Sequence, residues 1–150
     1  MNALPDLYQD LLLEHKRSPR NHGTLAQVDR QAQGHNPLCG DRISLQLRLC
    51  GEVVTDIAFE GEGCAICIAS ASLMTEAVKG HSVAQALQRA SCMHDLLVAD
   101  EPGEPQAAYL GKLIAMQGVR HHPSRIKCAM LAWRALERCL EVPHASDVPA

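Results

Sequence analysis

The sequence predicts an α+β fold, in which a small antiparallel three-stranded sheet carries helices packed on one face. From residue 42 to 59 apolar residues alternate with polar ones, which is the two-residue period of strands. From residue 65 to 140 apolar residues recur instead at helical spacing. A sheet segment followed by a run of helices is typical of this class, because each helix must bury an apolar stripe.

The opening element is predicted to be an amphipathic helix over residues 4–15. Its apolar residues recur at helical spacing, Pro5 suits a first helical turn, and Ser18-Pro19 ends the pattern.

A β-hairpin follows. One strand has Ile43, Leu45, Leu47 and Leu49 on its apolar face, and Gly51-Glu52 forms a plausible two-residue turn. We expect the apolar face of the returning strand to hold four residues: Val53, Thr55, Ile57 and Phe59. Residues 25–33 are the candidate for the third antiparallel strand, although their alternation is weak.

Helical periodicity then predicts helices to the end of the domain. The expected helices cover residues 66–78, 83–90, 106–117 and 123–140, with a turn-rich loop at 100–105 and a loose tail from about residue 143. The chain of 150 residues fits a single domain.

Composition excludes several classes of function. A net charge of −3 with scattered Lys and Arg offers no basic surface for nucleic acid. No apolar run reaches the roughly 18 residues of a membrane span. Seven cysteines without a secretory signal favour a cytoplasmic protein with reduced thiols, hence metal binding or thiol chemistry.

Three cysteines and one aspartate are candidate metal ligands. Cys39 and Asp41 share a turn before the first strand, Cys64 lies close to a helix start, and Cys128 falls in the second turn of the last helix. Three thiolates and one carboxylate suit tetrahedral Zn²⁺. Their wide spacing is weak evidence by itself, and free cysteines are most often small buried side chains. Arg125 is three residues before Cys128, so its guanidinium can reach that sulfur.

Four stretches of the chain form an ordered set of motifs: Leu7-Tyr8 through His15 with Pro19-Arg20-Asn21 and Gly23, the loop 36–41, the run 61–76 containing Ala69-Ser70-Ala71-Ser72, and Arg125-Ile126-Lys127-Cys128 with Leu131 and Trp133. This set resembles the U-type sulfur and iron–sulfur assembly family. The chain is more similar to the SufU-like branch than to the IscU-like scaffolds. Those scaffolds carry histidine where this chain has Lys127, and residues 95–121 can supply the extra segment of the SufU-like branch.

The resemblance implies a zinc-bound acceptor of persulfide sulfur, with Cys39, Asp41, Cys64 and Cys128 as ligands. The implied partners are a SufS-type cysteine desulfurase and, downstream, iron–sulfur scaffold proteins. We expect Cys39 to be the thiolate that leaves the metal and accepts sulfur, because a turn can move outward more easily than a helix. Arg125 is expected to assist, either by holding Cys128 as thiolate or by meeting the partner.

Two alternatives stay open at this point. The same ligands could hold a transient iron–sulfur cluster, as in an IscU-type scaffold, or a zinc ion that only stabilises the fold. Cys67 departs from the family pattern, and we expect it to pack at the helix start. His15 is expected to be a hydrogen-bonded structural residue.

Overall fold

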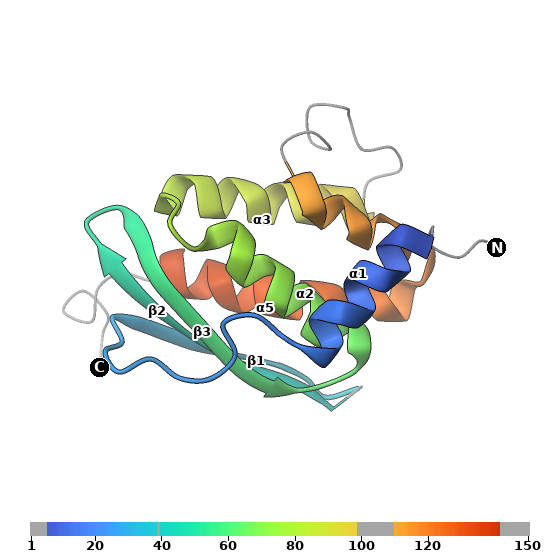
Figure 1. The fold of residues 1–150 in the computed structure, drawn as a ribbon, viewed down its shortest axis with the longest axis horizontal. Coiled ribbons are helices and arrows are strands. Elements are labelled where there is room, and N and C mark those ends of the chain that lie inside the picture. The colour runs from blue at the N-terminus through green and yellow to red at the C-terminus, as the bar shows by residue number, and fades with distance from the viewer. Residues whose placement is uncertain (1–5, 39, 99–109, 142–150) are drawn as a thin grey trace.

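The computed structural model describes residues 6–38, 40–98 and 110–141. Along the chain these residues form α1 (Asp6–Arg17), β1 (Arg30–Asn36), β2 (Asp41–Cys50), β3 (Val53–Glu62), α2 (Ala65–Val78), α3 (Val83–Val98), the 3₁₀ helix η1 (Gly111–His121) and α5 (Pro123–Glu141) (Figure 1). The predicted tail from about residue 143 lies outside the described residues.

The described strands form one antiparallel sheet in the order β1-β2-β3. The helices lie on one face of it, with α5 against β1 and β2, and α2 against β3 (Figure 1). The central helix is α2, which contacts α1, α3, η1 and α5 as well and is buried along most of its length. The predicted α+β class and three-stranded sheet are therefore confirmed.

The predicted inward face of the returning strand is wrong at its first two positions. Val54 is fully buried in β3, whereas Val53 is exposed and Thr55 faces solvent. The pairing shifts at a bulge: Arg48 pairs with Asp56 but Leu49 pairs with Val54, which leaves Thr55 as the extra residue. Because side chains alternate every residue, one inserted residue moves the residues before it to the opposite face.

The third strand lies several residues later than predicted. Residues 25–33 were expected, but β1 covers Arg30–Asn36. Its inward positions are Ala32, Gly34 and Asn36, which are small or polar and give no apolar alternation to detect. Gly34 packs under α5: a Cβ atom there would lie 3.0 Å from Cδ1 of Leu131, so glycine permits the close approach of helix and strand.

Two helical predictions also need correction. The expected helix 83–90 continues as α3 to Val98, because Met93, Leu96 and Leu97 extend its buried stripe. Of the expected helix 106–117, residues 106–109 lie outside the described part, and Leu110 is followed by the 3₁₀ helix η1. Gly111 has φ +58°, which breaks any right-handed helix running through it.

The segment after α1 covers part of the outer edge of β3. The Gly23 N–H donates to the Phe59 carbonyl (2.8 Å), and the Phe59 N–H donates to the Asn21 carbonyl (3.0 Å). Further along the same edge, the Val54 N–H donates to the His81 carbonyl (2.9 Å). The backbone of β3 is thus engaged at two places beyond its pairing with β2.

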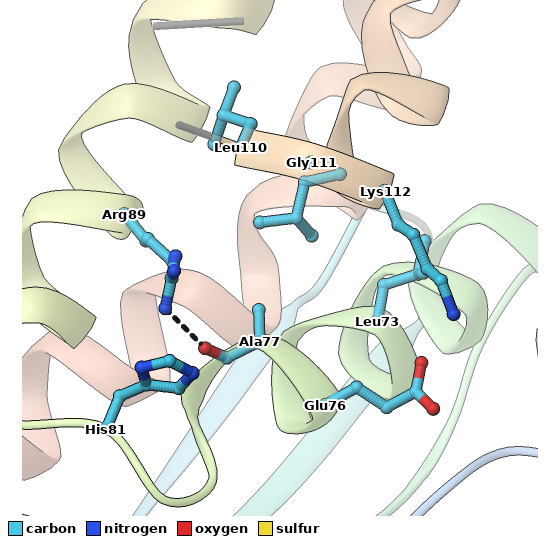
Figure 2. A pocket seen from close by; sticks show the side chains of 9 residues that line it. Leu73, Glu76, Ala77, His81, Arg89, Leu110, Gly111 and Lys112 are labelled. Atoms are coloured by element: carbon cyan, nitrogen blue, oxygen red, sulfur yellow. Dashed lines mark hydrogen bonds between the residues drawn. The ribbon is translucent and has the colours of Figure 1, made fainter. Parts of the chain in front are cut away.

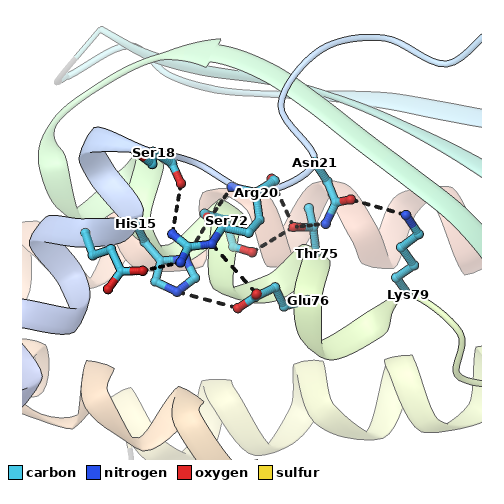
Figure 3. A network of polar contacts seen from close by, with 9 residues as sticks. His15, Ser18, Arg20, Asn21, Ser72, Thr75, Glu76 and Lys79 are labelled. Atoms are coloured by element: carbon cyan, nitrogen blue, oxygen red, sulfur yellow. Dashed lines mark hydrogen bonds and ion pairs between the residues drawn. The ribbon is translucent and has the colours of Figure 1, made fainter.

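A buried polar network fixes α1 on α2 (Figure 3). His15 is 1% exposed, and its Nδ1 lies 2.6 Å from Ser72 Oγ, while its Nε2 lies 3.5 Å from a Glu76 carboxylate oxygen. The Arg20 N–H donates to the same Ser72 hydroxyl (2.8 Å), and its guanidinium pairs with Glu14. His15 is therefore a hydrogen-bonded structural residue, as predicted. Within the described ranges, none of the helices has both the length and the apolar character to cross a membrane.

Candidate metal centre

The β2–β3 hairpin brings Asp41 and Cys64 together. Arg42 at the start of β2 pairs with Glu62 at the end of β3, so the residues just beyond this pair are neighbours. The Cys64 N–H donates to Oδ1 of Asp41 (3.2 Å). Cys64 is also the N-cap residue of α2, so its side chain lies at the positive end of the helix dipole.

Gly63 leaves the space in which these groups meet. A Cβ atom on it would lie 2.9 Å from Oδ1 of Asp41 and 3.0 Å from Sγ of Cys67. Both distances are too short for an ordinary contact, so any larger residue would displace the carboxylate or the thiol. Gly63 was not among the predicted site residues, although its place between the hairpin and Cys64 can be read from the sequence.

Helix α5 supplies the third group. Cys128 is fully buried on the second turn of α5, the turn that the sequence predicted. Its Sγ, a carboxylate oxygen of Asp41 and Sγ of Cys64 all lie within 4.8 Å of one another. Three separate parts of the chain thus place ligand atoms close enough together to bind one metal ion.

The cluster is electrostatically suited to a cation. Burial, together with hydrogen bonds to Asp41 and Cys64 and their negative charges, raises the pKa of the Cys128 thiol well above its ordinary value. Asp41 is 1% exposed, and its Oδ2 has no hydrogen-bond partner within the described part of the chain. A buried carboxylate oxygen without a partner costs free energy, and a bound divalent cation would remove this cost. The donor set therefore fits a zinc ion.

Arg125 lies on the solvent side of the cluster. The pKa of its guanidinium is raised, chiefly by a hydrogen bond to Cys64 and by that thiolate's charge, with a smaller contribution from Cys128. The sequence predicts that Arg125 reaches Cys128, whereas in the structure Arg125 interacts more strongly with Cys64.

The fourth predicted ligand, Cys39, lies outside the described residues. Its flanking turn is closed by the Gly40 N–H, which donates to the Asn36 carbonyl (2.8 Å). The side chain of Leu38 in this turn is 82% exposed.

The remaining cysteines differ in exposure. Cys67 is fully buried at the start of α2, as predicted, and is not one of the grouped ligand residues. Cys50 is exposed and Cys92 half-buried. Burial raises the pKa of Cys139 to about 11.

Known proteins similar to this chain share its fold over most of its length. Residues 7–129 match the model of the NifU-like N terminal domain. The zinc-dependent sulfurtransferase SufU of Bacillus subtilis (strain 168) is 44% identical over 138 residues, which are 90% of each chain. The iron-sulfur cluster assembly scaffold protein IscU of Streptococcus pyogenes serotype M1 is 38% identical, over 94% of this chain and 87% of its own.

A solved structure of a related protein has the same fold as this chain. It is the crystal structure of FiSufU, an iron-sulfur cluster assembly scaffold protein for the SUF system from the thermophilic Fervidobacterium islandicum AW-1. It superposes with a TM-score of 0.82 at 30% identity, covering 87% of this chain and 94% of its own.

Proposed function

Because the chain belongs to the family of NifU-like N-terminal domains and to its SufU-like branch, we propose that it is a zinc-dependent sulfur carrier for iron–sulfur cluster assembly. It would accept persulfide sulfur from a SufS-type cysteine desulfurase and deliver it to scaffold proteins. The cytoplasm, where thiols remain reduced, is the compartment that suits this chemistry.

One observation carries the proposal. Ligand atoms of Asp41, Cys64 and Cys128 lie within 4.8 Å of one another, and Oδ2 of the buried Asp41 lacks a partner among the described residues. These three residues would hold the zinc ion, with Cys39 as the fourth ligand. A bound zinc ion keeps coordinated thiols deprotonated and brings no redox chemistry of its own.

The proposed reaction is a thiolate attack on a persulfide. The thiolate of Cys39 attacks the outer sulfur of the donor's persulfide, and a new S–S bond forms. The donor's own S–S bond breaks, and its electron pair leaves with the donor cysteine as a thiolate. The transferred sulfur keeps its proton or charge, so neither an oxidant nor a reductant is needed. Asp41, Cys64 and Cys128 would hold the zinc ion while Cys39 reacts, and the Arg125 guanidinium would lie beside Cys64.

The test compares wild type with Cys39→Ser and with the matched control Cys50→Ser, whose thiol is exposed and distant from the cluster. Each protein is mixed with persulfide-loaded SufS-type desulfurase, and transfer is measured as the mass gain of one sulfur atom. We expect wild type and Cys50→Ser to gain sulfur and Cys39→Ser to gain none. Normal transfer to Cys39→Ser would exclude Cys39 as the acceptor.

A transient iron–sulfur scaffold is the second candidate function, favoured by the relative named IscU. Cysteine thiolates hold iron–sulfur clusters as well as zinc, and Asp41 could be a labile fourth ligand. Anaerobic reconstitution with iron and sulfide separates the two functions. A brown protein that passes its cluster to an apo-protein supports the scaffold, whereas a colourless protein with one zinc per chain supports the carrier.

A further inference from the structure

A pocket of about 280 Å³ opens beside the candidate metal centre, where β1, α3 and α5 meet. Two of its lining residues neighbour the cluster, since Asn36 pairs across the strands with Asp41 and Lys127 directly precedes Cys128. The residues around it are His35, Asn36, His94, Val98, Ile126, Lys127, Met130, Leu131 and Arg134.

Asn36, which lines this pocket, has a buried side-chain donor without an acceptor among the described residues. Asn36 is 8% exposed, and its Oδ1 accepts a hydrogen bond from the Leu38 N–H (3.2 Å). Its Nδ2 has no acceptor anywhere in residues 6–38, 40–98 and 110–141. A buried amide donor without an acceptor is unfavourable, so a ligand that supplies an oxygen would be bound preferentially.

The charge around the pocket is positive. Its lining contains Lys127 and Arg134 but no carboxylate, in a chain whose net charge is −3. Part of this charge is balanced at the rim, since Arg134 donates to Glu137 at 3.0 Å. Lys127 is exposed, and its ammonium group is therefore available to a carboxylate from outside.

Another cavity, of about 380 Å³ between α2, α3 and η1, has a different character (Figure 2). There Glu76 shares the lining with Arg89 and Lys112, and Arg89 already donates to the Ala77 carbonyl (2.7 Å). Its mixed charges select no particular ligand.

Apolar surface accompanies the positive charge of the first pocket. Val98 at its edge is 53% exposed, and Leu38, two residues from Asn36, is 82% exposed. Large exposed apolar side chains beside a reactive site are typical of a protein-binding surface. Apolar surface, a buried amide donor and an ammonium group together match an acidic side chain flanked by apolar residues.

We propose that this pocket binds an acidic side chain, flanked by apolar residues, from the protein that donates sulfur. The inference rests on the proposed function, because the pocket adjoins the thiols that would receive the sulfur. Docking here would place the donor's persulfide-bearing segment against the turn that holds Cys39. The contact is one of positioning: it sets how tightly the donor binds and leaves the chemical step unchanged.

The first experiment measures steady-state sulfur transfer from a SufS-type desulfurase at low ionic strength. Lys127→Glu reverses the charge at the pocket, and Lys16→Glu on α1, which lines no part of the pocket, is the matched control. We expect Lys127→Glu to raise KM for the desulfurase roughly tenfold, with unchanged kcat and zinc content, and added salt to reduce the difference. Lys16→Glu should resemble wild type.

The second experiment identifies the partner's chemical group. A water-soluble carbodiimide joins a lysine amine to a carboxylate in direct contact, and mass spectrometry locates the link. We expect Lys127 to be linked to an Asp or Glu of the desulfurase. Lys127→Arg keeps the positive charge but cannot form this link, so it should keep a wild-type KM and lose the cross-link.

The outcomes separate the two proposals. A wild-type protein that accepts no sulfur overturns the proposed function and the docking site with it. If the wild type accepts sulfur but Lys127→Glu has an unchanged KM, or no link forms at Lys127, the docking site is wrong while the sulfur-carrier function stands.

Discussion

Gly63→Ala tests the packing of the candidate metal centre. Gly63 is not among the described glycines with positive φ, so alanine introduces no backbone strain there. The effect comes from the new methyl group, which would lie 2.9 Å from Oδ1 of Asp41 and 3.0 Å from Sγ of Cys67. Both atoms are buried, so the carboxylate, the thiol or the backbone of residue 63 must shift to admit the methyl group.

The magnitude follows from two contributions. Overpacking of a close-packed site costs about 1–3 kcal/mol. Moving Asp41 also weakens its hydrogen bond from the Cys64 N–H, which at 3.2 Å is already long. If the free energy of zinc binding becomes less favourable by this amount, about 1–3 kcal/mol, zinc affinity decreases by about 5- to 150-fold.

The assay is competition for zinc against a chromophoric chelator, with the free energy of unfolding measured in parallel. Gly51→Ala is the control: Gly51 has φ +59° and open space around it, and it lies at the opposite end of the hairpin. That variant should lose about 1 kcal/mol of stability and keep its zinc affinity. A Gly63→Ala protein that binds zinc as tightly as wild type would refute the placement of Asp41.

Three further predictions follow from other parts of the molecule. Removing zinc from the zinc-loaded protein with a chelator should lower Tm by roughly 5–11 °C. A free zinc concentration of about 100 times Kd adds about 2.7 kcal/mol to the free energy of unfolding, and this is lost with the metal; an unchanged Tm would contradict the prediction. Burial lowers the pKa of His15 below 6.5, so its contribution to stability is complete above pH 6.5 and is lost as the pH falls below it. Urea unfolding of His15→Gln should therefore show a weaker pH dependence, and equal slopes would disprove the explanation. Iodoacetamide should alkylate exposed Cys50 in the folded protein but not Cys139, whose pKa is about 11; equal rates would count against the described burial.

Half of the candidate site was predictable from the hairpin. A turn at Gly51-Glu52 joins the predicted strands at 42–49 and 53–59. In an antiparallel hairpin the residue just before the first strand then lies beside the residues just after the second strand. Asp41 and Cys64 are those residues, and the structure places them within one hydrogen bond of each other. The bulge at Thr55 was not predictable, because Val53 and Val54 are both apolar and the alternation from Val53 to Ile57 therefore looks unbroken in the sequence.

The position of Cys128 could not be obtained from local patterns. It depends on where α5 crosses the sheet, which is set by the contact of Leu131 with Gly34, a residue whose lack of a side chain leaves no apolar signal. The same reasoning explains why β1 was misplaced. The position of Cys128 and the bounds of β1 both depend on packing between residues far apart in the sequence, which local periodicity does not reveal.

The covering of β3 by the segment after α1 has a consequence for behaviour at high concentration. An uncovered edge strand presents free N–H and C=O groups, which invite strand addition from a second molecule and, in the end, aggregation. Asn21 and Gly23 occupy such groups at the middle of β3, and His81 occupies another near its start. Intermolecular sheet growth through this edge would first require the chain to release its own N-terminal segment.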